Sequence, residues 1–247
     1  MAIVKRRNVR LYLERELTGD TLALGEREAH YLGTVLRLRS GDRLVAFDGR
    51  GTERAAVVRS IGRRGAELEL EDALEPLPES PLALTLVQAV VKSDAMDRIV
   101  QKATELGVAA IAPAFTEFGV VKLENERSER RVEHWLRIAQ SACEQSGRHV
   151  PPAVHPPAPL GAVLDALAPA GLRLSLVPGA SCKLDALPAH AAAATVAIGP
   201  EGGWGAEDLR ELRGAGFEEI DLGPRILRAD TAALAACALL QQRWGDL

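Results

Sequence analysis

The chain has 247 residues, of which 47% are hydrophobic and 26% are charged, and its formal net charge at pH 7 is −4. This is the composition of a soluble globular protein that can bury a core, and it excludes a protein that is basic throughout. No apolar run reaches the roughly 18 residues of a membrane span, so we expect a cytoplasmic protein without a membrane partner.

The charge is divided unevenly along the chain. Residues 1–72 contain 14 Lys and Arg against 12 Asp and Glu, which leaves 16 against 22 for the remaining residues. Arginine clusters in the first part, such as Arg6 with Arg7 and Arg37 with Arg39, could follow the phosphates of a nucleic acid. A solvated arginine-rich surface would have the same composition, so the charge alone leaves RNA binding as a hypothesis.

The first 70 residues read as short strands around one helix. Apolar and polar residues alternate near Val9 and over 55–58 and 67–70, and the run 44–47 ends in an Asp-Gly turn. The single expected helix covers residues 25–36. Three prolines within residues 73–81 exclude a helix interior or a central strand there. We therefore predict a small β-barrel over 1–72, a linker over 73–81 and a second domain over 82–247.

The second domain alternates strands with helices, which predicts an α/β fold with a largely parallel sheet. Its predicted strands are 82–90, 109–113, 172–177, 195–198 and 219–222, and its predicted helices are 94–106, 127–146, 206–215 and 230–242.

Two glycine-bearing turns follow strands near the C-terminus. One reads Ile-Gly-Pro-Glu-Gly-Gly over 198–203, and the other reads Leu-Gly-Pro-Arg-Ile-Leu-Arg-Ala-Asp-Thr over 222–231. Glycine lets the backbone approach a ligand closely, so both turns are candidates for one shared pocket, although a tight turn between strand and helix would need the same residues. Neither turn matches a Walker loop or a dinucleotide fingerprint.

Charged residues in these turns are candidates for chemistry. Glu201 stands between glycines at a strand end, where a carboxylate is poorly placed for packing and well placed to face a ligand. Arg228 directly precedes a predicted helix, where the helix dipole disfavours a cation, so a role toward a ligand is the more attractive one. Asp230 could instead serve only to cap that helix.

Further polar residues lie on the predicted helices. Lys92 precedes one helix, and Lys102 with Glu105 and Glu144 with Arg148 have the spacing of surface ion pairs. His30 is either a buried, hydrogen-bonded histidine or a residue at the lip of the first domain. The five histidines form no hydrolase or metal motif, and Cys143, Cys182 and Cys237 stand alone, so no metal is expected.

Taken together, the motifs resemble those of the bacterial 16S ribosomal RNA uracil-N3 methyltransferases of the SPOUT class. The resemblance covers nearly the whole chain and includes the segments 30–42, 101–107, 144–148, 199–203, 222–231 and 243–246, together with Lys92, Met96 and Asp97. It implies a PUA-like β-barrel that helps to bind RNA, followed by an α/β domain whose C-terminus is threaded as a trefoil knot.

The resemblance also implies a cofactor, partners and site residues. S-adenosylmethionine would be held by three loops: Val177, Pro178 and Gly179; Ile198, Gly199, Pro200, Glu201, Gly202 and Gly203; and Leu222, Gly223, Ile226, Leu227 and Arg228. The RNA-binding candidates are Arg6, Arg7, His30, Arg37, Lys92, Lys102 and Arg148. The protein would be a homodimer acting on one uridine of the decoding region in assembled 30S subunits.

The chemistry required of such a site can be argued from the base itself. Uracil N3 must lose its proton as the methyl group arrives, so the site needs a proton acceptor and a group that stabilises the developing negative charge. We assign the stabilising role to Arg228 and the acceptor role to Glu201 or Asp230.

Two departures from the family pattern keep another class open. Arg-Ala-Asp-Thr at 228–231 replaces the usual Arg-Thr-Glu-Thr, and Thr-Glu-Phe at 116–118 lacks an arginine that is common there. A non-catalytic RNA-binding protein of ribosome assembly would tolerate both changes. A nucleotide-binding enzyme is disfavoured by the absence of a phosphate-binding lysine in the glycine loops.

Overall fold

A computed structural model of the chain describes residues 9–119, 125–167 and 171–247. The chain forms two compact units. The first comprises the residues up to Pro78 together with 143–150, and the second comprises 79–142 together with 151–247. The boundary thus falls inside the proline-rich segment, while 143–150, which the sequence placed in the second domain, belongs to the first unit.

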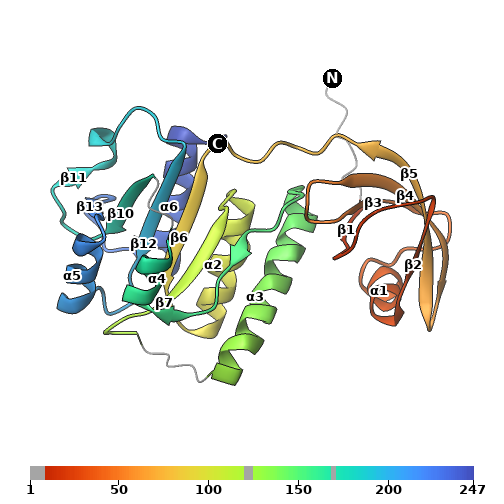
Figure 1. Cartoon of the computed structure of the whole chain (residues 1–247), viewed down its shortest axis with the longest axis horizontal. Coiled ribbons are helices and arrows are strands. Elements are labelled where there is room, and N and C mark those ends of the chain that lie inside the picture. Colours follow the sequence, from red (N-terminus) through yellow and green to blue (C-terminus); the bar gives the residue numbers. More distant parts are fainter. Residues whose placement is uncertain (1–8, 120–124, 168–170) are drawn as a thin grey trace. The chain divides into compact units, whose positions relative to one another are not determined.

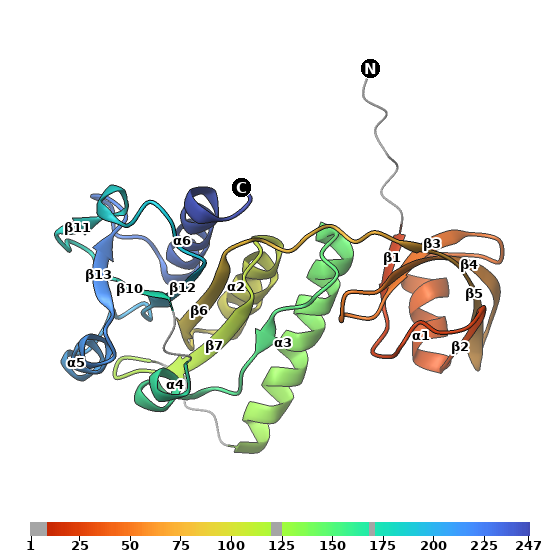
Figure 2. The ribbon, with the colours of Figure 1, turned by 45° about the horizontal axis from the view of Figure 1, so that its top comes forward.

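The first unit is a curved sheet of five strands that encloses a short helix. The strand order is β1-β3-β4-β5-β2, and all neighbours are antiparallel except β1 with β3. Helix α1 packs against β5 within the curve of the sheet (Figure 2). The elements are β1 Val9–Tyr12, β2 Thr21–Leu24, α1 Glu26–His30, a π-helical turn Tyr31–Val35, β3 Arg43–Phe47, β4 Glu53–Gly62 and β5 Gly65–Leu74.

The predicted elements of this unit are present, with longer strands than expected. The helix predicted over 25–36 is divided between α1 and the π-helical turn, and β5 continues to Leu74, two residues into the predicted linker. Strand β2, four residues long, was not predicted. The alternating apolar residues of all five strands meet α1 in one core, which includes Leu32 and Leu68, both fully buried.

Residues 143–150 join the first unit through a partly buried polar network. Glu144 accepts hydrogen bonds from the Tyr12 backbone N–H at 2.9 Å and from the Tyr31 hydroxyl at 2.6 Å. Nearby, Arg10 forms an ion pair with Glu53 and lies over the Phe47 ring at 4.6 Å. Burial raises the pKa of Glu144 above its usual value, although both of these hydrogen bonds favour the carboxylate. The side chain of Glu144 therefore serves the packing of the first unit.

The second unit is a parallel sheet with helices on both faces (Figure 1). The strand order is β11-β13-β10-β12-β6-β7-β8, with β9 also paired to β7, and all of these pairings are parallel. The strands are β6 Ala83–Ala89, β7 Ala110–Phe115, β8 Ala153–Val154, β9 Ala158–Pro159, β10 Leu172–Leu176, β11 Cys182–Lys183, β12 Ala193–Ile198 and β13 Glu218–Asp221. The helices are α2 Ser93–Glu105, α3 Asn125–Ser146, α4 Leu160–Ala166, the 3-10 turn Leu184–Ala186, α5 Ala206–Gly214 and α6 Ala229–Trp244.

Both faces of this sheet are buried, as is usual for parallel sheets. On one face Leu86 of β6 and Ile198 of β12 pack with residues of α2 and α6, and on the other face Val87 and Ala197 pack with residues of α4 and α5. The alanines of α6 let this helix lie close to α2, β6 and β12. Each of the strands and helices predicted for this unit is present, whereas α4, β8, β9, β11 and the 3-10 turn were not predicted. Within the described parts of the chain no helix is long and apolar enough to cross a membrane.

Candidate active site

Four neighbouring strands bring their carboxyl ends to one edge of the sheet. Strands β13, β10, β12 and β6 are adjacent and parallel, so the segments that follow them emerge side by side. These segments are the predicted loops 177–179, 199–203 and 222–228, together with Lys92 before α2. Ligands of open α/β sheets bind at this edge.

The loop after β12 is a tight turn fixed by a tryptophan. The Gly203 N–H donates to the Pro200 carbonyl at 2.9 Å, and Gly203 has a φ of 75°, which an L side chain rarely adopts. The Trp204 ring lies 3.2 Å from the position that a Cβ on Gly199 would occupy. Its Nε1–H donates to the Leu176 carbonyl at 3.0 Å. Trp204 thus ties the turn at 199–203 to the end of β10.

The loops after β10 and β13 are joined by Asp221. Its carboxylate accepts from the Gly223 N–H at 3.3 Å, is paired with Lys183 and is also hydrogen-bonded to the backbone of Gly179. The Lys183 ammonium is the main reason that the pKa of Asp221 lies below its usual value. These contacts hold 177–179 and 222–223 in fixed positions beside the turn at 199–203.

Three glycines leave the backbone of these loops uncovered. A Cβ built on Gly179, Gly203 or Gly223 would meet no atom within 4 Å, and all three have positive φ. A small molecule can therefore approach the main chain closely at all three loops, although the N–H groups of Gly203 and Gly223 already donate to Pro200 and Asp221. This arrangement fits a ligand held largely by backbone contacts, as the sequence predicts for the cofactor.

A segment that follows β7 supports the turn from another side. Asp208 accepts from the Gly205 N–H at 2.9 Å and from the Glu117 N–H at 3.1 Å, and Glu117 in turn accepts from the Glu207 N–H. Phe118 lies 3.1 Å from where a Cβ on Gly202 would be. The segment 116–118, which departs from the family pattern, is therefore a packing partner of the glycine turn.

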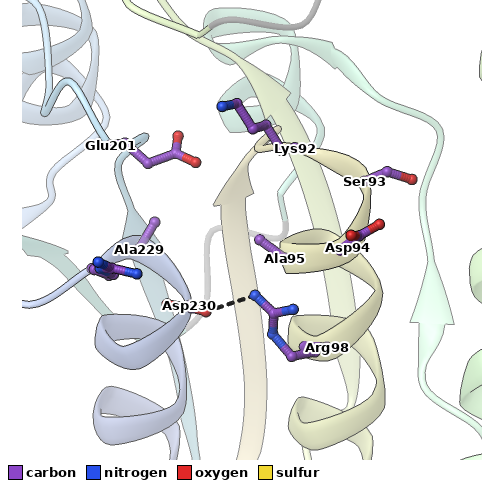
Figure 3. Close-up of a pocket in the computed structure, with 9 residues that line it drawn as sticks. Lys92, Ser93, Asp94, Ala95, Arg98, Glu201, Ala229 and Asp230 are labelled. Atoms are coloured by element: carbon purple, nitrogen blue, oxygen red, sulfur yellow. Dashed lines mark hydrogen bonds and ion pairs between the residues drawn. The ribbon is translucent and has the colours of Figure 1, made fainter.

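A pocket of about 640 Å³ lies at this edge, between the N-termini of α2 and α6 (Figure 3). It brings together all three predicted catalytic residues, Glu201, Arg228 and Asp230, with Lys92. Its other lining residues, which the sequence did not indicate, are Ser93, Asp94, Ala95, Arg98 and Ala229.

The charged groups of the pocket differ in their partners. Asp230 accepts from the Arg98 guanidinium at 3.1 Å and from the Thr231 N–H at 2.8 Å, and the hydrogen bond from Arg98 is the main reason that its pKa is lowered. In contrast, the side chains of Lys92, Asp94, Glu201 and Arg228 form neither an ion pair nor a hydrogen bond with any other described residue. Four of the charges in the pocket are therefore available to a ligand.

The structure refines the capping interpretation of Asp230. Helix α6 begins at Ala229 with Arg228 as its N-cap, so the cation does precede the helix directly. Asp230 lies in the first turn and bonds the N–H of the next residue rather than capping the helix from outside it. Its second oxygen is turned toward α2 (Figure 3).

The remaining candidates for RNA binding that the structure describes lie in both units and do not line the pocket. In the first unit His30 is exposed, with Nδ1 3.3 Å from the Thr34 hydroxyl, so the interpretation of a buried histidine was wrong. Arg37 is exposed with a φ of 57°, and the Arg148 carbonyl accepts from Arg10. In the second unit Lys102 donates to Glu105 at 2.8 Å.

Several of the cofactor candidates can also be placed. Leu222 and Leu227 are partly buried against the core of the second unit, whereas Ile226 is 86% exposed. Arg6 and Arg7 lie outside the described residues. Among those that are described, no group of three or more His, Cys, Asp or Glu could hold a metal ion.

The chain matches two family models. A model described as an RNA methyltransferase domain matches residues 78–241, and one described as an RNA methyltransferase PUA domain matches residues 24–71.

Related proteins match over most of their length. Ribosomal RNA small subunit methyltransferase E of Synechocystis sp. is 37% identical over 226 residues, which are 88% of this chain and 72% of the relative. The protein of the same name from Mycobacterium tuberculosis is 31% identical and covers 92% of this chain, with 89% of its own length matched.

Solved structures give the same result. A methyltransferase from Legionella pneumophila in complex with S-adenosylmethionine superposes with a TM-score of 0.93 at 35% identity, over 98% of this chain and all of that one. Ribosomal RNA small subunit methyltransferase E from Neisseria gonorrhoeae, bound to S-adenosylmethionine, gives 0.90 at 36% identity, over 97% and 99% of the two chains.

Proposed function

Because the chain belongs to the ribosomal RNA small subunit methyltransferase E family, we propose that it methylates N3 of one uridine in 16S rRNA. The methyl donor is S-adenosylmethionine, and the substrate is the decoding region of the assembled 30S subunit. Family membership supports methylation of ribosomal RNA with this donor, and the resemblance of the motifs supports the uridine, the atom and the 30S subunit. The observation that carries the proposal is the pocket at the carboxyl edge, where Lys92, Glu201 and Arg228 have no partners among the described residues.

The cofactor would be held by the three loops at this edge. The open space at the Cβ positions of Gly179, Gly203 and Gly223 lets a ligand lie close to the main chain of these loops. The proposed ligands are Val177, Pro178, Gly179, Ile198, Gly199, Pro200, Glu201, Gly202, Gly203, Leu222, Gly223, Ile226, Leu227 and Arg228. When bound there, S-adenosylmethionine supplies an electrophilic methyl group on a positively charged sulfur.

The residues of the pocket would act on the uracil. Arg228, whose guanidinium has no partner in the described parts of the chain, can stabilise the negative charge that develops on a uracil oxygen as N3 loses its proton. We assign the role of proton acceptor to Glu201, because its carboxylate is exposed in the turn and has no partner among the described residues. Asp230 is a poorer acceptor, since Arg98 and the Thr231 N–H already bind its oxygens and its pKa is lowered.

RNA would be bound by basic side chains of both units. In the first unit His30 and Arg37 are exposed, which suits contact with phosphates, and Arg148 is assigned with them. In the second unit Lys92 lines the pocket and Lys102 is partly exposed beside Glu105. The target base has to be unstacked to reach a pocket of this kind, which favours a single-stranded or flipped uridine.

Three further properties belong to the proposal. The strand order supports a threaded C-terminus, because β12 lies between β10 and β6 while the chain continues from β13 back to α6, which packs against α2 and β6. Apolar side chains that remain exposed near the C-terminus, Leu239 and Leu247, are candidates for a homodimer interface. The cellular site is the cytoplasm, where 30S subunits are found.

The test uses 30S subunits that lack the modification. They are incubated with the protein and S-adenosylmethionine, and the 16S rRNA is digested and analysed for 3-methyluridine by mass spectrometry. We expect one 3-methyluridine per subunit, in a fragment of the decoding region, and little product from protein-free 16S rRNA. Methylation at another atom, or equal activity on free rRNA, would contradict the finer proposal, and cofactor binding without any product would favour a non-catalytic assembly factor.

A further inference from the structure

The ion pair between Arg98 and Asp230 crosses the pocket from one helix to another. Arg98 lies on the second turn of α2 and Asp230 on the first turn of α6, and their side chains point toward one another (Figure 3). The distance from Nη2 to Oδ2 is 3.1 Å, and the side chains are 57% and 25% exposed. Exposed pairs of this kind contribute little to stability. Stability alone is therefore a weak reason for a charged pair in this place.

Asp230 has a second potential partner much closer in sequence. Arg228 lies two residues before it, lines the same pocket and carries a guanidinium on a long flexible stem. In the structure, however, Asp230 is bound to Arg98 and the Thr231 N–H, and the side chain of Arg228 has no partner among the described residues. Of the two arginines in the pocket, Asp230 thus binds Arg98, the one farther away in sequence, while the other carboxylates of the pocket, Asp94 and Glu201, have no partner among the described residues.

We propose that Arg98 is a positioning residue that binds Asp230 and thereby keeps Arg228 unpaired and available to the substrate. This inference rests on the proposed function of Arg228 as the group that stabilises the uracil oxygen. Without Arg98, the Asp230 carboxylate is released and pairs with Arg228. The Arg228 guanidinium is then neutralised and turned away from the reacting base.

The proposal predicts a rescue by a second mutation. Replacing Arg98 with Met removes the charge while keeping an unbranched side chain, and it should lower kcat at least about tenfold because a hydrogen bond to developing charge is lost in the transition state. Adding Asp230→Asn removes the carboxylate that would capture Arg228. The double variant Arg98→Met with Asp230→Asn should therefore be faster than Arg98→Met alone. Arg98→Lys keeps a cation for Asp230 and should lose less activity than Arg98→Met.

A matched control is available on another helix. Arg213 on α5 pairs with Glu219 at 2.6 Å, and these side chains are 61% and 27% exposed, so the pair resembles Arg98–Asp230 but lies outside the pocket. Arg213→Met should leave kcat, KM and the affinity for S-adenosylmethionine unchanged. A loss common to both Met variants would indicate a general effect of removing a surface ion pair.

A second readout does not require methyl transfer. The rate at which phenylglyoxal modifies Arg228 can be followed by mass spectrometry of peptides from a protease that does not cleave at arginine. Arg228 is exposed, so we expect rapid modification in the wild type, a rate at least about threefold lower in Arg98→Met, and recovery in the double variant.

The two readouts separate the two proposals. An inactive wild-type protein with the expected pattern of Arg228 modification would reject the proposed function and retain the role of Arg98 toward Asp230. Equal kcat for the wild type and Arg98→Met, or a double variant slower than Arg98→Met, would overturn the inference. Unchanged modification of Arg228 in Arg98→Met would also overturn it.

Discussion

Polar side chains are used in opposite ways in the two units of the chain. In the first unit Glu144 accepts hydrogen bonds from Tyr12 and Tyr31, and Glu53 is paired with Arg10, so the polar groups are satisfied internally. In the second unit Glu201 and Arg228 lie in one pocket without partners among the described residues. The comparison indicates that the first set holds residues 143–150 against the sheet, while the second set is kept for a ligand.

Replacing Arg228 should have the largest effect and test this comparison most strongly. Because we assign Arg228 to stabilise charge in the transition state, Arg228→Ala should lower kcat by about 100- to 1,000-fold, as the loss of one such donor does in other enzymes. Its free energy of unfolding should change by no more than about 0.5 kcal/mol, since the side chain is exposed and unpaired. Methylation kinetics on 30S subunits and denaturant unfolding measure the two quantities, and a normal rate would reject the assignment.

A substitution in the glycine turn should affect the cofactor rather than the base. A Cβ on Gly202 would lie 3.1 Å from Phe118, so the larger side chain in Gly202→Val has to displace the turn. Displacement of this kind costs about 1–3 kcal/mol, and we expect the affinity for S-adenosylmethionine to fall at least about tenfold in a calorimetric titration. Gly214→Val is the control, because no atom lies within 4 Å of that Cβ position.

Weakening the polar network of the first unit should lower the free energy of unfolding and leave cofactor binding in the pocket unchanged. Glu144→Ala removes the acceptor of two hydrogen bonds and should lower the free energy of unfolding by about 2 kcal/mol, with unchanged affinity for S-adenosylmethionine. Glu144→Gln keeps an acceptor and a donor in place, so it should lower the free energy of unfolding less than Glu144→Ala does. Weakened cofactor binding in Glu144→Ala at a temperature where it is folded would contradict the separation of roles.

The pH dependence of the same network has a definite sign. The pKa of Glu144 is raised by burial, so the folded chain binds this proton more tightly than the unfolded chain. The resulting stabilisation is complete below the usual glutamate pKa of about 4.3 and is lost as the pH rises through the raised value. Relative to Glu144→Gln, the wild type should therefore lose stability as the pH rises above about 4.3, and a wild type that gains stability relative to Glu144→Gln as the pH rises would contradict the direction of the shift.

The smallest effect is expected where only the support of a loop is altered. Trp204→Phe keeps an aromatic ring against Gly199 and removes the hydrogen bond from Nε1–H to the Leu176 carbonyl. The net value of such a bond is about 1 kcal/mol, so the affinity for S-adenosylmethionine should fall about fivefold. An affinity equal to that of the wild type would show that the turn at 199–203 holds its position without this bond.

Much of this arrangement follows from local sequence, and the rest depends on contacts between distant residues. Apolar alternation and the glycine and proline positions predict the strands and helices to within a few residues, and the order of strands and helices predicts a parallel sheet. Glu201 and Arg228 were recognisable because each stands where packing or the helix dipole disfavours it. The pocket brings both of them together with Asp230, as the shared-pocket hypothesis requires.

Other residues gave no local signal. Arg98 lies within an ordinary charged helix, and only the packing of α2 against α6 brings it to Asp230, 132 residues away. Trp204 and Glu117 likewise act through partners on other elements, Leu176 at the end of β10 and Glu207 in α5. Residues 143–150 continue a helix of the second unit in sequence, and their place in the first unit depends on Tyr12 and Tyr31.

We expect the loops at the carboxyl edge of the second unit's sheet to bind the cofactor of a methyltransferase. Calorimetric titration of S-adenosylmethionine into the full-length protein tests it most directly, with Gly202→Val measured in parallel. We predict saturable binding to the wild type that is weakened at least about tenfold in Gly202→Val. Absence of binding to the wild type, or equal binding to both proteins, would contradict the claim that these loops form the cofactor site.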